Sequence, residues 1–299
     1  MNEIYHVSFP GIGIDSITIS RVAFRLFGIN VYWYGLLIAS SVVISLFLAY
    51  RASHKFGVDK DHVLDTIIAI VPAMIIFARL YYVVFALDEF KGNWAGIFNL
   101  RNGGLAFYGG VIGGVLAAYI VTRIRKIPFS RLSDLLIVYL PLAQGIGRWG
   151  NFFNQEAFGT NTRLPWGMIS EGTKDYLSKI GGFDPLMPVH PTFMYEFLAN
   201  MLIFVLLIFV REKSKRPFET TAVYFMAYGL VRFFTESIRT DSLYIGNTNI
   251  RVSMMLSAIM FIAATIVLLI IRRKPVIEGK AGIVKVNIEN SHDEEQINC

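Results

Sequence analysis

Cysteine is nearly absent from this 299-residue chain, whose single cysteine, Cys299, is the last residue. A disulfide within the chain is therefore excluded, and a cysteine-based covalent intermediate is not expected. The chain also lacks a G-x-S-x-G elbow, an H-E-x-x-H helix and a phosphate-cradling P-loop. It shows no internal repeat of the kind that inverted-repeat transporters carry. We accordingly expect neither a metal nor another cofactor.

Charged residues are scarce. They make up 17% of the chain against 54% hydrophobic residues, whereas soluble domains carry about 25%, and the mean hydropathy is +0.51. Apolar segments near the ~20 residues needed to cross a membrane recur along the chain. They lie near 31–50, 63–87, 105–122, 134–150, 192–210, 220–238 and 252–271. The sequence therefore predicts an all-α integral membrane protein with seven spans, of which the fourth is the weakest.

Basic residues predict the orientation of these spans. Clusters follow the first, third, fifth and seventh spans, beginning at Arg51, Arg123, Arg211 and Arg272. Seven spans place all four clusters on one side, which the positive-inside rule makes cytoplasmic. The N-terminus is then outside and the C-terminus inside. The net charge of +6 reflects this topology, so no nucleic-acid partner is expected.

The segments outside the spans give the expected domain organisation. Residues 1–28 lack a basic region followed by an apolar core, so they predict an extracytoplasmic or interfacial segment and no cleavable signal peptide. Residues 29–274 form the membrane domain. Within it, 160–190 is the longest polar interruption and is expected to be an extracytoplasmic head. Residues 275–299 read as a cytoplasmic tail.

An unusual polar motif closes the fourth predicted span, where Gln144–Gly159 reads QGIGRWGNFFNQEAFG. A charged side chain near the bilayer centre costs roughly 2.5–3.5 kcal/mol and persists mainly where it binds something. Arg148 has the planar fork that suits a phosphate. Asn151 and Asn154 can orient an ester or a glycerol hydroxyl, and Glu156 is either a salt-bridge partner or a ligand contact. The motif predicts a lipid-phosphate site, the alternative being an arginine that only snorkels to the headgroups.

Polar groups of other spans are predicted to lie at the same, outer depth. On the sixth span Arg232 and Glu236 are spaced i,i+4, so Glu236 either orients Arg232 for a ligand or simply neutralises it. The further outer-leaflet residues are Tyr34, Arg79, Tyr82 and Tyr108, and Tyr228 shares one face of the sixth span with Arg232, four residues before it. Around Tyr108, the pairs Gly109/Gly113 and Gly110/Gly114 predict close helix packing.

Motifs in this order resemble those of the bacterial prolipoprotein diacylglyceryl transferases. They are W-Y-G at 33–35, R-L-Y-Y at 79–82, G-G-L-A-F-Y-G-G at 103–110, S-D at 133–134, G-R-W-G-N-F-F-N-Q-E-A-F-G at 147–159, H-P-T-F-M-Y-E at 190–196 and Y-G-L-V-R-F-F-T-E at 228–236. The resemblance implies a multi-pass enzyme of the bacterial plasma membrane. Its members transfer the diacylglyceryl group of phosphatidylglycerol to the lipobox cysteine of a preprolipoprotein and release glycerol phosphate.

With this resemblance, Tyr108, Arg148 and Arg232 are the expected catalytic residues. The expected substrate-binding residues are Tyr34, Arg79, Tyr82, Asn151, Asn154, Glu156, Gly159, Tyr228 and Glu236. The chain departs from better-studied members, which carry histidine where it has Tyr108. Histidine, with a pKa near 6.5, is a better acceptor of a thiol proton than a free phenol with a pKa of about 10. The identity of the base therefore stays open.

Two other functional classes fit part of the pattern. A carrier or scramblase for anionic lipids would also place arginines and glycines in membrane helices. Against it stand the missing repeats and the polar groups confined to the outer half of the spans. A purely structural scaffold would leave the buried arginines without a purpose.

Overall fold

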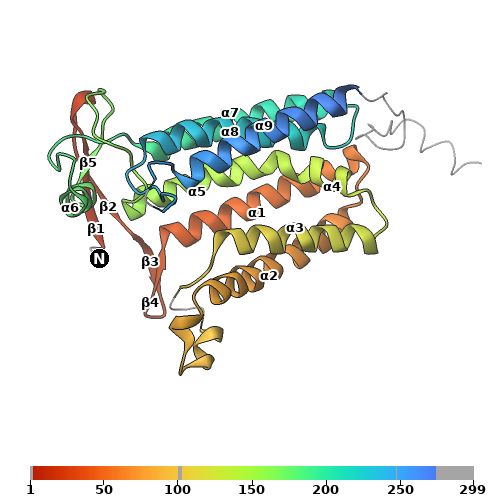
Figure 1. Ribbon diagram of the computed structural model, residues 1–299, viewed down its shortest axis with the longest axis horizontal. Helices are drawn as coiled ribbons and strands as arrows, with labels where there is room; N and C mark the ends of the chain where they lie inside the picture. Colours follow the sequence, from red (N-terminus) through yellow and green to blue (C-terminus); the bar gives the residue numbers. More distant parts are fainter. Residues whose placement is uncertain (1–2, 100–102, 247, 274–299) are drawn as a thin grey trace, which may run out of the picture. The chain divides into compact units, whose positions relative to one another are not determined.

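Helices dominate the structure, a computed structural model that describes residues 3–99, 103–246 and 248–273 (Figure 1). The α-helices are α1 Trp33–Ser53, α2 Lys60–Phe85, α3 Phe107–Ile124, α4 Phe129–Leu136, α5 Leu140–Asn154, α6 Glu171–Ile180, α7 Thr192–Lys213, α8 Glu219–Ile238 and α9 Val252–Arg273. The strands are β1 Ile4–Phe9, β2 Ile14–Ser20, β3 Val22–Leu26, β4 Ile29–Tyr32 and β5 Ile169–Ser170. Short 3₁₀ turns are η1 Pro10–Ile12, η2 His54–Phe56, η3 Leu87–Phe90, η4 Trp94–Phe98 and η6 Ile137–Tyr139.

Five of these helices, α1, α2, α3, α7 and α9, are long and apolar enough to cross a membrane. Large apolar side chains face outward along all of them, as in a protein whose surroundings are hydrocarbon. The predicted sixth span coincides with α8. The fourth, 134–150, is not one helix, because η6 separates α4 from α5 ahead of Pro141. Multiple membrane passes are thus supported, on a mostly helical fold.

Local sequence explains where α2 and α6 begin. Asp59 precedes α2, and its Oδ1 accepts a hydrogen bond of 2.9 Å from the Asp61 N–H. Ser170 and Thr173 form a reciprocal capping box at the start of α6. Such caps satisfy N–H groups that the first helical turn leaves unpaired.

The expectation of an all-α fold is wrong at the N-terminus. Strand β1 pairs antiparallel with β2 and with β5, and β3 pairs with β4. The N-terminal segment was predicted to end at residue 28. That position lies in the tight turn between β3 and β4, and β4 continues to Tyr32 before α1 begins. Alternating side chains of β1 (Tyr5, Val7) join Met168 and Leu177 in one apolar core. The N-terminal strands and the 160–190 segment therefore build one small subdomain, which we call the head (β1, β2, β5 and α6).

The described chain divides into two compact units. The first contains residues 3–47 and 136–273, with the head, α5, α7, α8 and α9. The second contains 48–135, with α2 and α3. Residues of the predicted cytoplasmic tail, 275–299, lie outside the described part of the chain.

Glycines allow close helix contacts within each unit. In the second unit a Cβ on Gly113 would lie 2.5 Å from the Ala73 carbonyl oxygen, and one on Gly109 would meet that of Phe77. The small-residue pairs of α3 therefore pack against α2, as their spacing predicted. In the first unit Gly229 of α8 similarly lies against the backbone of α9.

Candidate active site

The buried carboxylate of Glu196 lies at the centre of a group of arginines in the first unit. Its side chain is 4% exposed and projects from the second turn of α7. Arg148 Nη2 lies 2.7 Å from Glu196 Oε2, and Arg232 Nη1 lies 3.7 Å from the same oxygen. Arg239, directly after α8, places Nη1 3.9 Å from Oε1. Three guanidinium groups thus share one carboxylate; together with Glu236 we call these residues the arginine cluster.

The pair Arg232–Glu236 forms on α8 as its i,i+4 spacing predicted. The Glu236 side chain is only 2% exposed, and its main-chain carbonyl accepts a hydrogen bond from Arg251. Arg232 Nη1 is buried and makes no hydrogen bond to any described residue. A buried donor without a partner costs about 1–3 kcal/mol. This nitrogen is therefore positioned to donate to a ligand.

Positive charge exceeds negative charge by one around this cluster. The four cations are Arg148, Arg232, Arg239 and Arg251, and the three carboxylates are Glu196, Glu236 and Asp241. Asp241 accepts two hydrogen bonds from Arg239, at 2.8 and 2.6 Å. Burial would raise the pKa of Asp241, but these hydrogen bonds and the charge of Arg239 outweigh it and hold that pKa below its usual value. The excess positive charge favours an anionic ligand.

A chain of hydrogen bonds extends from the cluster along the end of α5. Arg148 Nη1 donates to Asn151 Oδ1 at 3.4 Å. Asn151 and Asn154 both donate to Glu156 Oε1, at 3.0 and 3.2 Å, and Asn154 accepts from Arg21 at 3.3 Å. The residues of the polar motif thus lie together, with Glu156 accepting from two amides. Among the described side chains, no ion pair of Glu156 falls within 4.0 Å.

Packing of α5 against α7 fixes the direction in which Arg148 points. The ring of Trp149 contacts Phe193 and Phe197 of α7, with centroids 5.3 and 5.8 Å apart. A Cβ on Gly145 would lie 2.6 Å from Met201, so the two helices approach closely at this glycine. The rotation of α5 that these contacts require turns Arg148 toward Glu196.

The backbone after α5 is strained. Gln155 and Ala157 adopt positive φ angles of 53° and 57°, which side chains other than glycine rarely take. The segment that follows is tied to two helix ends, because the Gly159 N–H donates to His190 O at 2.9 Å and the Thr160 N–H to Ile238 O at 2.8 Å. A Cβ on Gly159 would lie 2.8 Å from the His190 Cβ. Gly159 therefore joins the start of α7 to the end of α8.

Two predicted tyrosines lie in the same unit. Tyr34 packs beneath Gly150 of α5, where an added Cβ would lie 2.6 Å from the Tyr34 ring. It also lines a small recess with Asn154 and Arg21. Tyr228 stacks on Tyr224 of the same helix, with ring centroids 5.6 Å apart.

The structure gives Arg79, in the second unit, a different task from the predicted one. Its five N–H donors all reach main-chain carbonyls of the segment before α3, at 2.7–3.2 Å. These belong to Gly96, Ile97, Asn99, Gly103 and Gly104. A guanidinium group has only five N–H donors, so none remains for a phosphate. In this structure Arg79 therefore holds the loop, and its predicted role in binding substrate stays a prediction.

Tyr82 and Tyr108 complete the predicted set. Tyr82 donates to Glu89 Oε2 at 2.7 Å, so it too supports the loop. Tyr108 is the second residue of α3, is 48% exposed and contacts Phe107 edge to face. Its hydroxyl forms no hydrogen bond within 3.5 Å among the described residues.

Sequence reasoning missed Glu196, the centre of the cluster. The signal was present, because an acidic residue in an otherwise apolar span requires a partner or a ligand. It lay in the H-P-T-F-M-Y-E stretch, which is a weak signal by itself. Arg239 and Arg251 were missed as partners because their positions depend on how α8 ends.

These observations define a class: a multi-pass membrane protein with a buried, net-positive arginine–carboxylate cluster between helices. The family model for prolipoprotein diacylglyceryl transferase matches residues 21–270. A phosphatidylglycerol–prolipoprotein diacylglyceryl transferase of Clostridioides difficile is 43% identical over 226 residues, covering 76% of this chain and 86% of the relative. Relatives of that name from Finegoldia magna and Enterococcus faecalis are each 40% identical. The first alignment covers 82% of this chain and 93% of the relative, and the second covers 86% of this chain and 92% of the relative. The chain belongs to the prolipoprotein diacylglyceryl transferase family.

Proposed function

We propose that this protein is the enzyme that transfers the diacylglyceryl group of phosphatidylglycerol to a prolipoprotein, the first step of lipoprotein maturation. The acceptor is the thiol of the lipobox cysteine. Its sulfur forms a thioether bond to the glyceryl carbon, the bond between that carbon and the phosphate oxygen breaks, and glycerol phosphate leaves. Family membership supports the reaction. The observation that carries it on the structural side is the arginine cluster around Glu196.

Arg148 and Arg232 bind the phosphate in this scheme. Negative charge grows on the leaving phosphate as the carbon–oxygen bond breaks, and cationic donors in a poorly hydrated site stabilise it. Both guanidinium groups lie within 4.0 Å of the same oxygen of Glu196 and are therefore close to each other. One small anion can thus contact both. Arg232 Nη1, which makes no hydrogen bond to a described residue, is the nitrogen that a phosphate oxygen would meet.

The remaining residues position these two arginines and the lipid. Glu196 pairs with the guanidinium group of Arg148 and Glu236 with that of Arg232, which fixes the position of both groups. Asn151 and Asn154, already aligned by Glu156, present amides to an ester or glycerol hydroxyl. Tyr34 lines the recess beside Asn154 and faces the glyceryl portion.

Tyr108 acts on the acceptor thiol. A thiolate is the nucleophilic form of cysteine, so a proton must leave the lipobox cysteine near neutral pH. Tyr108 either takes that proton or positions the acceptor, and its exposed hydroxyl at the first turn of α3 is compatible with either role.

The membrane arrangement follows the basic loops. Seven spans place the N-terminus and the head outside the bacterial plasma membrane and the tail at 275–299 in the cytoplasm. In this arrangement α8 and the α4–α5 run supply the two spans beyond the five long apolar helices. The arginine cluster, at the head-side ends of α5, α7 and α8, then lies in the outer leaflet.

The decisive experiment incubates purified protein with phosphatidylglycerol vesicles and a lipobox peptide. A mass gain equal to one diacylglyceryl group on the peptide cysteine is the expected result, and a Cys→Ser peptide is the control. An unmodified cysteine, with labelled lipid moving between leaflets, would contradict the transferase and favour the alternative carrier or scramblase.

A further inference from the structure

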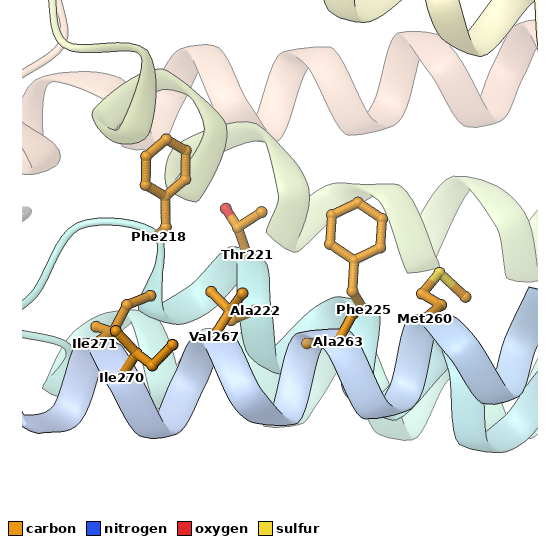
Figure 2. Close-up of a pocket in the computed structure, with 10 residues that line it drawn as sticks. Phe218, Thr221, Ala222, Phe225, Met260, Ala263, Val267, Ile270 and Ile271 are labelled. Carbon is orange, nitrogen blue, oxygen red and sulfur yellow. The ribbon is translucent and has the colours of Figure 1, made fainter.

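An apolar groove runs between α8 and α9, away from the arginine cluster. Its volume is about 460 Å³. Phe218, Thr221 and Phe225 line it from the α8 side, and Met260, Val267 and Ile271 from α9. Figure 2 shows Phe218 and Ile271 at one end of the groove and Phe225 and Met260 at the other.

The dimensions of the groove fit one hydrocarbon chain. From Met260 to Ile271, α9 rises by about 16 Å at ~1.5 Å per residue, close to half of the ~30 Å hydrocarbon thickness. An acyl chain of a single leaflet has about this length.

Positive charge gathers at the Phe218 end. Arg272 and Arg273 follow Ile271 directly, and both are exposed, as is Lys215 just before Phe218. Arg272 Nε also lies 3.2 Å from Glu219 Oε1, which ties the two helices together at this end. Basic residues beside an apolar binding surface favour lipids with anionic headgroups.

Phe218 itself is unusual. It precedes α8 with a φ of 64°, a left-handed conformation that costs of order 1–3 kcal/mol in a residue with a bulky side chain. Phe218 lies at the same end of the groove as Ile271 (Figure 2). The residue is 37% exposed, so part of the ring stays open to the surroundings of the protein.

We propose that this groove binds one acyl chain of an anionic phospholipid. The headgroup lies beside Arg273 and Lys215, and the chain follows α9 to Met260. The site is separate from the arginine cluster, lies at the opposite end of α8, and takes no part in the transfer reaction. It recognises the phosphate of the lipid by charge and its chain by shape.

Tryptophan quenching by brominated lipids tests this site. Met260→Trp places a tryptophan in the groove, and the neighbouring Ile259→Trp places one at the same depth on an exposed face outside it. Each variant is measured in phosphatidylcholine vesicles that contain a fixed fraction of brominated phosphatidylglycerol or of brominated phosphatidylcholine. Wild-type protein in the same vesicles supplies the signal of the four native tryptophans.

We expect brominated phosphatidylglycerol to quench Met260→Trp more strongly than brominated phosphatidylcholine, and 1 M salt to weaken this preference. Adding Arg273→Gln should reduce the preference about fivefold, the effect of one basic residue beside an anionic lipid. Lys174→Gln, in the head, removes the same charge and should leave it unchanged. Ile259→Trp should respond equally to the two lipids.

Equal quenching of Met260→Trp by the two lipids would overturn the proposal, since the groove would then face ordinary bilayer. Absence of quenching by either lipid would also overturn it, since another protein surface would cover the groove. Should Met260→Trp fail to fold, Val267→Trp in the groove and Ile266→Trp outside it form a second matched pair. The readout does not depend on transferase activity, so the failure of either proposal is recognisable separately.

Discussion

Glu196 Oε2 lies 2.7 Å from Arg148 Nη2, so a carboxylate of α7 and a guanidinium group of α5 meet where solvent hardly reaches. Breaking such a buried pair by removing one partner costs about 3–5 kcal/mol, because the other charge is left uncompensated. The pair also fixes where the Arg148 fork points. Stability and site geometry therefore depend on the same contact.

Glu196→Gln keeps the shape of the side chain and removes its charge. We expect kcat/KM to fall about 10²-fold, the loss that accompanies a misplacement of about 1 Å in a catalytic group, together with a lower Tm. Glu196→Asp should recover part of the activity. Glu171→Gln, which removes an exposed carboxylate paired with His6 in the head, is the control. Wild-type kcat/KM in Glu196→Gln would exclude a positioning role.

Arg148→Lys and Arg232→Lys retain charge and lose the planar fork. Each should lose most of its transferase activity, because an ammonium group cannot replace two parallel N–H donors. Membrane expression should stay near normal. Arg125→Lys alters a half-exposed arginine paired with Asp65 and serves as the matched control. Wild-type turnover in both test variants would show that these arginines only contact the lipid headgroups at the membrane surface and that the phosphate binds elsewhere.

Tyr108→Phe separates a base from a positioning residue. If the hydroxyl takes the thiol proton, the rate should drop by roughly 10²–10⁴-fold, and Tyr108→His should restore turnover with its pH profile shifted to lower pH. If it only positions the acceptor, Phe should cost about tenfold or less and leave the pH profile unchanged. Tyr119→Phe, on the same helix and similarly exposed, is the control. Undiminished turnover would remove Tyr108 from the mechanism.

Arg79→Lys tests whether this arginine holds the loop or binds lipid. Lysine has three donors where Arg79 uses five, so amide hydrogen exchange at 93–99 should accelerate. The KM for phosphatidylglycerol should change much less than in Arg148→Lys. Arg123→Lys, an exposed arginine of α3, is the control. Unchanged amide hydrogen exchange together with a raised KM for phosphatidylglycerol would instead support a substrate-binding role for Arg79.

Accessibility tests the proposed topology. In a Cys299→Ser background, a cysteine replacing Lys174 in the head should react with an impermeant reagent from outside intact cells. One replacing Lys215 should react only after permeabilisation, because its basic loop is expected in the cytoplasm. The opposite pattern would reverse the depth of every polar group in the spans.

Hydropathy and spacing predicted the parts of this structure that local sequence determines. Six of the seven predicted apolar runs became single helices, Arg232 paired with Glu236 one turn away, and Gly109 and Gly113 packed α3 against α2. Pairings between distant segments were not predictable in this way. Strand β1 pairs with β5 more than 150 residues later in the chain, and no local pattern specifies such a partner.

The same distinction explains the site. Arg148 was identifiable because an arginine stands out in an apolar run. Arg79 stood out equally, yet its donors reach a loop whose path depends on tertiary folding. Composition indicates that a buried arginine needs acceptors, and only the fold decides whether these belong to a ligand or to the chain itself.

The five hydrogen bonds of Arg79 also have a mechanical consequence. The loop before α3 cannot open without leaving carbonyls unpaired, and the contact of Gly109 and Gly113 with α2 prevents α3 from sliding along it. The two helices therefore form one hairpin that carries Tyr108 near its tip. Gly57 and Lys126 lie at its base in left-handed conformations, with φ angles of 65° and 56°. A displacement of Tyr108 that admits a bulky acceptor should thus move α2 together with α3.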